Sequence, residues 1–188
     1  MTTQLVLIRH GQTQWNRVGR WQGQANPLLS MLGRRQARRA GKELLGARLE
    51  HLYSSDLHRA LETAQIIGAA LGLAVIPDPR LREINLGRWQ GMLSVDIETQ
   101  YPDEFRRWHT SPLTMRPPDG EDIHTLAARV LEAISEIALR HPGQRIGVVA
   151  HELPIAVVLA HVRGVDLAHL RALIPATGTW QEVTWEGM

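Results

Sequence analysis

Short apolar runs that stop abruptly at polar residues constrain the fold of this 188-residue chain more than any other feature. Residues 4–8 form one such run, rich in leucine and β-branched side chains, and it ends in Arg9-His10-Gly11. Residues 145–150 form another, which ends at His151. Runs of this length are typical of buried strands. Because helical patterns separate the strands, we expect a three-layer α/β/α sandwich around a mostly parallel central sheet.

The remaining elements follow from hydrophobic spacing and from capping signals. Ser30 is the expected N-cap of a helix that carries Leu32, Gln36, Ala40 and Leu44 along one stripe. We expect further helices over 56–71, with Asp56 as its cap, 122–139, and 154–161 beginning at Pro154. Further strands are expected over 51–55, 73–77 and, at the sheet edge, 179–185.

Length and composition fit one domain over 1–188, with no repeat or linker. Residues 86–119 are interrupted by glycine and proline, which indicates a lid or insertion of short pieces. We expect a cytoplasmic protein with no membrane partner, because no signal peptide pattern and no apolar run of bilayer length occurs. The net charge is only +2, and the arginines of 34–39 resemble a solvated helix face, so we expect no nucleic-acid partner.

Two composition counts bear on chemistry. Cysteine is absent, which excludes disulfides, thiolate metal sites and a cysteine nucleophile. Lys42 is the only lysine, so 20 of the 21 basic residues are arginines. A guanidinium binds phosphate or carboxylate in a two-pronged way, but genomic base composition also explains most of this excess. Only the position of each arginine along the chain can show whether it binds an anion or reflects base composition.

Polar side chains gather where the predicted strands end. Arg9-His10, Ser54-Ser55 and His151 all follow apolar runs, and parallel α/β sheets bind ligands beyond the carboxyl ends of their strands. An imidazole with one nitrogen fixed by a hydrogen bond presents the other as a nucleophile. Arginine beside it suits phosphoryl transfer, which needs positive charge around the phosphoryl oxygens. A single histidine of this kind is more often structural, so the pair carries the argument.

Five ordered motifs spanning residues 5 to 151 resemble the histidine phosphatase superfamily, which includes the phosphoglycerate mutases. The first is Leu7 to Thr13 with its Arg-His-Gly core, followed by Asn26-Pro27-Leu28. The others are Ser54 to Leu57 with Arg59-Ala60, Leu81 to Gly87 with Trp89 and Gly91, Gly120-Glu121, and Val148 to His151. The stretch from Tyr101 to Trp108 resembles the broad-specificity and α-ribazole phosphatase branches, so the expected fold is phosphoglycerate mutase-like.

The resemblance implies a role for each site residue. His10 would form a phosphohistidine, with Arg9 and Arg59 on the phosphoryl oxygens and His151 as a second imidazole on the phosphate. Asn16 resembles a donor to the phosphate, and Gln22 is included as a substrate contact. Glu83 would protonate the leaving oxygen and then activate water. Because one carboxyl must serve both steps, we expect an elevated pKa for Glu83.

One position departs from the family pattern. Relatives often have glycine after the second histidine, but this chain has Glu152. A carboxylate aimed at a phosphate dianion would repel it. Either this side chain turns away, toward an arginine for example, or it influences which leaving group is accepted.

Water is the expected phosphoryl acceptor, and a small phosphorylated metabolite the expected partner. Only residues 92–119 separate the third motif from Gly120-Glu121, and 37 residues follow His151, which is short for a mutase. The alternatives are a phosphoglycerate mutase and a non-catalytic member that binds phosphorylated ligands. A metal site built from His10, His151 and Glu83 is disfavoured by Arg9 and Arg59, so we expect no metal and no cofactor. A homodimer is left open.

Overall fold

A five-stranded sheet forms the centre of the computed structural model, which describes residues 2–186. Its order is β3-β2-β4-β1-β5. All neighbours are parallel except β5, which runs antiparallel to β1 at the edge. The mostly parallel sheet and the antiparallel edge strand are therefore confirmed. The strands are β1 (Thr3–Arg9), β2 (His51–Ser54), β3 (Val75–Pro77), β4 (Arg145–Ala150) and β5 (Trp180–Trp185).

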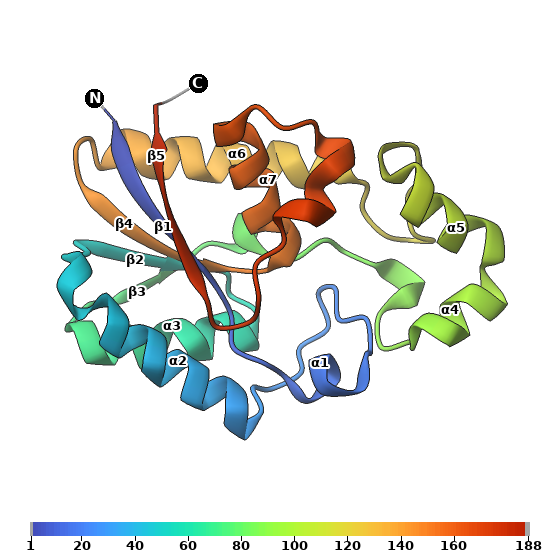
Figure 1. Cartoon of the computed structure of the whole chain (residues 1–188), viewed down its shortest axis with the longest axis horizontal. Helices are drawn as coiled ribbons and strands as arrows, with labels where there is room; N and C mark the ends of the chain where they lie inside the picture. Colours follow the sequence, from blue (N-terminus) through green and yellow to red (C-terminus); the bar gives the residue numbers. More distant parts are fainter. Residues whose placement is uncertain (1, 187–188) are drawn as a thin grey trace.

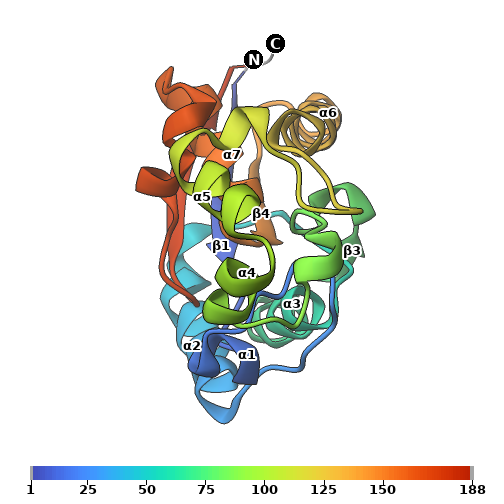
Figure 2. The same cartoon turned by 90° about the vertical axis from the view of Figure 1, so that its right-hand side faces the viewer.

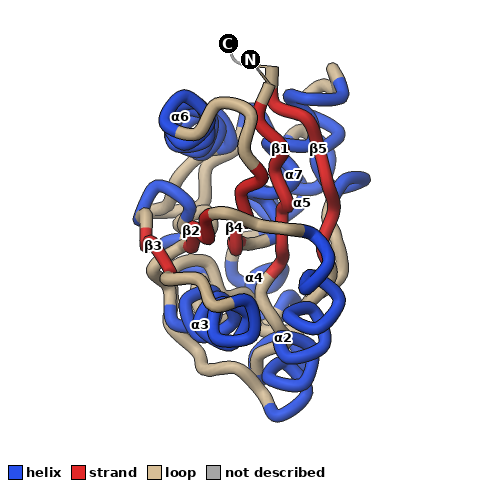
Figure 3. Tube along the Cα trace, turned by 90° about the vertical axis from the view of Figure 1, so that its left-hand side faces the viewer, coloured by secondary structure: helices blue, strands red, loops and turns tan. Residues whose placement is uncertain are grey.

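Helices cover both faces of the sheet, which confirms the three-layer sandwich (Figures 1 and 3). The larger helices are α2 (Met31–Glu43) and α3 (His58–Leu71) on one face, and α6 (Ile123–Arg140) and α7 (Glu152–Arg163) on the other. Successive side chains of β1 point to opposite faces of the sheet, so each face contributes to its own hydrophobic core. Leu5 and Leu7 pack toward α6 and α7, whereas Val6 and Ile8 pack toward α2 and α3.

Of the predicted caps, Ser30 is confirmed, and two helix starts are corrected. The Ser30 hydroxyl accepts from the Gly33 amide at 3.1 Å, and Asp122 caps α6. However, α3 begins at His58 rather than Asp56, because the Asp56 carboxylate pairs with Arg82. Helix α7 begins at Glu152 rather than Pro154, since a proline in the first turn removes no helical hydrogen bond. The strands predicted over 73–77 and 51–55 span only 75–77 and 51–54.

The buried face of α2 differs from the predicted stripe. Ala40 and Leu44 are buried as predicted, but Leu32 is 46% exposed, and the other residues of α2 that pack are Gly33, Ala37 and Gly41. Small residues are needed because α2 lies close against α3: a Cβ added at Gly41 would lie 3.1 Å from that of Ala70. The arginines of 34–39 lie on the surface side as expected, where Arg34 pairs with Glu62.

The segment 86–119 consists of short pieces at one end of the molecule, beyond the carboxyl ends of the strands (Figures 1 and 2). They are η3 (Gly87–Trp89), α4 (Ser94–Gln100), α5 (Pro102–Thr110) and η4 (Pro112–Thr114). Trp89 is fully buried, and its ring meets Trp21 edge-on at 5.6 Å. The other short helices are α1 (Gln14–Val18), η1 (Leu44–Ala47), η2 (Pro79–Leu81) and η5 (Leu167–Leu173).

No single helix within residues 2–186 is long and apolar enough to cross a membrane. Helices α7 and η5 reach the required length only together, across a bend of 112°.

Candidate active site

Adjacent parallel strands place two histidines side by side. His10 directly follows β1 and His151 directly follows β4, and these strands pair from Gln4↔Arg145 to Arg9↔Ala150. The two rings lie 5.1 Å apart, centroid to centroid. Both side chains are buried, with His151 fully so. The strand-end positions predicted from the sequence thus come together.

The His10 ring has one nitrogen fixed and the other facing a charge. Its Nδ1 donates to the Gly11 carbonyl at 2.7 Å, which leaves the lone pair on Nε2. Arg59 Nε donates to this Nε2 at 3.2 Å. Burial, helped by the charge of Arg59, holds the pKa of His10 well below its usual range. A neutral imidazole with a directed lone pair is the form that can act as a nucleophile.

Arg59 is a buried guanidinium fixed by backbone. It is 1% exposed, and its Nη1 and Nη2 donate to the Ala25 and Gly23 carbonyls at 2.8 and 2.7 Å. Burial lowers its pKa to about 10, so it stays charged at neutral pH. The α3 turn that carries it is tied to the His10 loop by Thr63, whose hydroxyl donates to the Arg59 carbonyl and accepts from the Gly11 amide.

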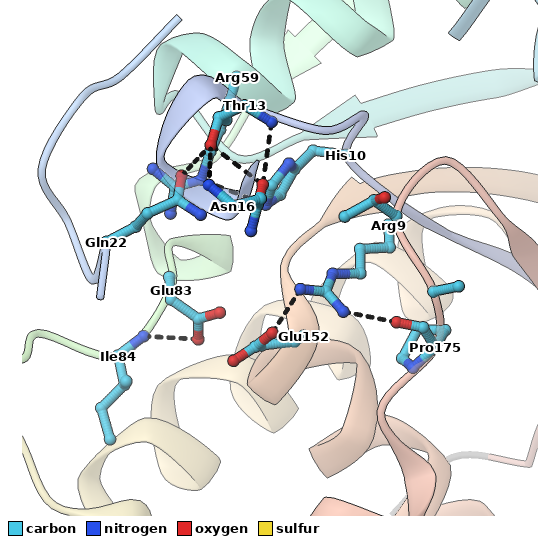
Figure 4. A network of polar contacts seen from close by, with 12 residues as sticks. Arg9, His10, Thr13, Asn16, Gln22, Arg59, Glu83, Ile84, Glu152 and Pro175 are labelled. Atoms are coloured by element: carbon cyan, nitrogen blue, oxygen red, sulfur yellow. Dashed lines mark hydrogen bonds and ion pairs between the residues drawn. The ribbon is translucent and has the colours of Figure 1, made fainter. Parts of the chain in front are cut away.

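Two buried nitrogens near His10 have no partner among the described residues: Arg9 Nε and His151 Nδ1. The other nitrogens of these side chains are occupied. Arg9 Nη1 donates to the Pro175 carbonyl at 2.6 Å and Nη2 pairs with Glu152 (Figure 4). His151 Nε2 bonds Ser55 Oγ at 2.8 Å. Buried polar atoms normally have partners, so these two are suited to bind oxygens of a ligand. Burial, and then the positive charge of Arg59, also keep the pKa of His151 well below its usual range.

Glu83 is a buried carboxyl that shares this site. It is 6% exposed, and its Oε1 accepts from the Ile84 amide at 2.9 Å. Burial, with the Glu152 carboxylate acting in the same direction, raises the pKa of Glu83 to about 7, as expected from the sequence. The neighbouring arginines are engaged elsewhere, Arg82 with Asp56 and Arg88 with Asp119. Glu83 therefore belongs to the site and not to a surface ion pair.

Asn16 and Gln22 meet at the buried Thr13. The Thr13 hydroxyl lies 3.0 Å from Asn16 Oδ1 and 2.9 Å from Gln22 Oε1, and it also caps α1 (Figure 4). Both amide side chains line the same cavity as His10. The structure thus brings together every residue that the sequence singled out.

A cavity of about 290 Å³ opens beside these residues. Its polar lining consists mainly of Arg9, His10, Asn16, Gln22, Arg59, Glu83 and Glu152. The apolar lining includes Trp21, Leu86, Trp108, Ile123, Leu153 and Leu170. His151 is fully buried, in contact with His10, and is not among the residues that line the cavity. This combination can hold a phosphoryl group against His10 with an organic group against the apolar lining.

Several residues that shape the site were not identified from sequence. Arg129, on α6, donates to the Arg80, Arg82 and Glu83 carbonyls at 2.7, 2.7 and 3.0 Å and so fixes the Glu83 loop. Backbone carbonyls such as that of Pro175 leave no sequence signal. Ser55 belongs to the second motif, Ser54 to Leu57, but its hydrogen bond to His151 depends on the fold.

The Gly11 position has a packing reason. A Cβ there would lie 2.4 Å from the Gly33 carbonyl oxygen, at the start of α2. Glycine is required for this close approach of two backbones.

Two histidines and Arg9 at the carboxyl ends of parallel strands, with Arg59 at the start of α3, form an arrangement suited to binding a phosphoryl group. The chain is a member of the histidine phosphatase superfamily (branch 1), whose sequence profile matches residues 5–188. The family resemblance inferred from the five motifs is confirmed.

Several named proteins and one solved structure are similar to the chain over most of its length. Phosphoserine phosphatase 1 from Hydrogenobacter thermophilus is 38% identical over 87% of this chain and 78% of the relative. Glucosyl-3-phosphoglycerate phosphatase from Mycobacterium tuberculosis is 37% identical over 96% of this chain and 82% of the relative. The crystal structure of the α-ribazole phosphatase from Shigella flexneri matches with a TM-score of 0.88 at 26% identity, covering 95% of this chain and 89% of that one. Other relatives are named probable phosphoglycerate mutases.

Proposed function

We propose that this protein hydrolyses small phosphomonoesters through a phosphohistidine on His10. The observation that carries the proposal is the neutral His10 ring, whose Nε2 lone pair faces the Arg59 guanidinium at the edge of the cavity. Membership of a phosphatase family and the phosphatase names of its relatives support the same reaction.

The first step transfers the phosphoryl group to the histidine. His10 Nε2 attacks phosphorus, the P–O bond to the leaving group breaks, and Glu83 gives its proton to the departing oxygen, which leaves as an alcohol. Arg9, Arg59 and His151 stabilise the negative charge on the phosphoryl oxygens. The pKa of about 7 allows Glu83 to hold this proton near neutral pH.

The second step returns the enzyme to its starting state. The Glu83 carboxylate takes a proton from water, whose oxygen bonds to phosphorus while the P–N bond to His10 breaks. Inorganic phosphate leaves, His10 is again neutral and Glu83 again protonated. The sum is one ester plus one water giving one alcohol and one phosphate, with no metal or cofactor in the scheme.

Water is preferred over a second phosphoglycerate as the acceptor, which separates a phosphatase from a mutase. The assay measures phosphate release from p-nitrophenyl phosphate and from 3-phosphoglycerate, with 2-phosphoglycerate formation followed in parallel. We expect phosphate release that is lost in His10→Ala and kept in His58→Ala, since His58 is an exposed residue next to Arg59. Formation of 2-phosphoglycerate without phosphate release would identify a mutase, and binding without turnover a non-catalytic member.

Asn16 and Gln22 complete the proposed substrate contacts, through the amide groups that Thr13 positions. A small phosphorylated metabolite in the cytoplasm remains the predicted partner. The sequence leaves a homodimer open, and light scattering after size-exclusion chromatography measures the oligomeric state.

A further inference from the structure

Glu152 is an unusual neighbour for a phosphate site, because it brings a carboxylate into a cavity built around guanidinium groups. It is the first residue of α7, directly after His151, and its side chain is 42% exposed and lines the cavity. One oxygen, Oε2, pairs with Arg9 Nη2. No hydrogen bond to the other oxygen, Oε1, occurs within residues 2–186. That second oxygen is therefore available to a ligand.

Glu152 lies close to Glu83, the proposed proton donor, and this places it near the leaving group. Figure 4 shows the Glu152 carboxylate between Glu83 and Arg9. The Glu152 charge acts on the pKa of Glu83, as expected for two carboxyls sharing a cavity. In the proposed reaction Glu83 protonates the leaving oxygen, so the first atoms beyond that oxygen lie next to Glu152. In that reaction Arg59 and Arg9, the partner of Glu152, are the groups proposed to bind the phosphoryl oxygens.

We infer that Glu152 selects phosphomonoesters whose leaving group carries an ammonium close to the ester oxygen. An ammonium there would donate a charge-assisted hydrogen bond to Glu152 Oε1, whereas a carboxylate at the same place would be repelled. The inference rests on the proposed phosphatase function and narrows its substrate class to amine-bearing esters.

The other charged groups of the cavity do not reverse this preference. Arg171 also lines the cavity, but its Nη1 bonds His109 Nδ1 at 2.9 Å and its Nη2 donates to the Trp108 carbonyl at 3.2 Å. Arg20 is bound to the Gly91 carbonyl through Nη1. These two guanidiniums are held against the segment 86–119, whereas Glu152 is directed to Arg9 near the reacting phosphoryl group.

The test compares three small esters that differ in one charge: 2-aminoethyl phosphate, 2-hydroxyethyl phosphate and carboxymethyl phosphate. Glu152→Gln removes the charge but keeps an oxygen that can accept from Arg9, so Arg9 stays in place. Glu182→Gln is the matched control, since Glu182 is 41% exposed and also pairs with an arginine, Arg145, on the sheet edge.

We expect wild-type kcat/KM to be highest for the amino ester and lowest for the carboxylate. Glu152→Gln should lower the amino-to-hydroxy ratio of kcat/KM about tenfold, the cost of one charge-assisted hydrogen bond, and raise the carboxylate-to-hydroxy ratio. Glu182→Gln should leave both ratios unchanged.

Equal loss on all three esters in Glu152→Gln would overturn the inference and make Glu152 a positioning residue for Arg9 alone. A wild-type chain that releases phosphate from none of them, nor from p-nitrophenyl phosphate, would overturn the proposed function itself.

Discussion

At the scale of single residues, the site depends on neighbours that are distant in sequence. The motifs singled out His10, Arg59, Glu83 and His151, and the fold brings these residues together. The motifs could not show that Arg9 is shared between Pro175 and Glu152, since that contact joins three separate segments. Of the two outcomes considered for Glu152, the structure shows the turn toward an arginine, and the side chain still lines the cavity.

Glu83→Gln tests the proton donor. Because burial raises the pKa of Glu83 to about 7, the protonated form needed for the first step is lost as pH rises through that value. Wild-type kcat/KM for an alkyl phosphate should therefore fall above about pH 7. In the glutamine variant kcat/KM should no longer decrease above this pH. The variant should be slower than wild type by about a hundredfold or more on alkyl esters, and by much less on p-nitrophenyl phosphate. Equal loss on both substrates argues against an acid role.

The same variant carries a stability prediction. The pKa of Glu83 rises from 4.5 to about 7 on folding, so its stabilising contribution is full below 4.5 and is lost as pH rises through about 7. Glutamine has no such loss. The free energy of unfolding of Glu83→Gln, relative to wild type, should increase by about 2–3 kcal/mol between pH 5 and pH 8. Urea unfolding at both pH values measures this, and a constant difference would mean that Glu83 is not held protonated.

At the scale of elements, hydrophobic spacing predicted the helices and strands but not how closely they pack. The α6 positions Leu126, Val130, Ile134 and Ile137 are all buried as predicted. The packed face of α2 was predicted correctly at Ala40 and Leu44 but not at Leu32, because the small residues that pack there reflect the proximity of α3, which periodicity does not encode. The role of α6 in holding Glu83 through Arg129 was equally invisible, since a polar residue on a helix gives no indication of which carbonyls it reaches.

Arg129→Gln tests this link between α6 and the Glu83 loop. The variant loses three bonds to carbonyls and the ion pair with Glu121, while no contact with the cavity is removed. We expect kcat to fall about tenfold with little change in KM, and stability to fall by about 2 kcal/mol. The pH above which kcat/KM falls should also be lower than in the wild type, because a looser loop exposes Glu83 to water and lowers its pKa.

Arg140→Gln is the control on the same helix, where an exposed pair with Glu136 contributes under about 1 kcal/mol. A normal kcat and pH profile in Arg129→Gln would show that the Glu83 loop is held without it.

At the scale of the whole molecule, the sheet order determines which strand ends meet. The sequence identified the individual strands and the parallel class, and the order β3-β2-β4-β1-β5 then places β1 beside β4. That pairing joins residues about 140 positions apart, which local pattern cannot predict. The same arrangement leaves no group of three His, Asp or Glu side chains suited to a metal within residues 2–186.

Chelation tests the metal-independent scheme. Dialysis against EDTA should leave phosphate release unchanged, because the Arg9 and Arg59 guanidiniums supply the positive charge that a metal would otherwise supply. Added zinc should give no gain. Activity that disappears on chelation and returns with one divalent metal would require a different mechanism.

Trapping of a covalent intermediate tests the central claim most directly. Brief incubation with a 32P-labelled phosphomonoester, followed by rapid quenching in alkali, should leave a label on the protein that is stable to base and lost in acid. Peptide mapping should place it on His10, with no label in His10→Ala and normal labelling in His58→Ala. Labelling of another residue, or full turnover by His10→Ala, would contradict the phosphohistidine mechanism.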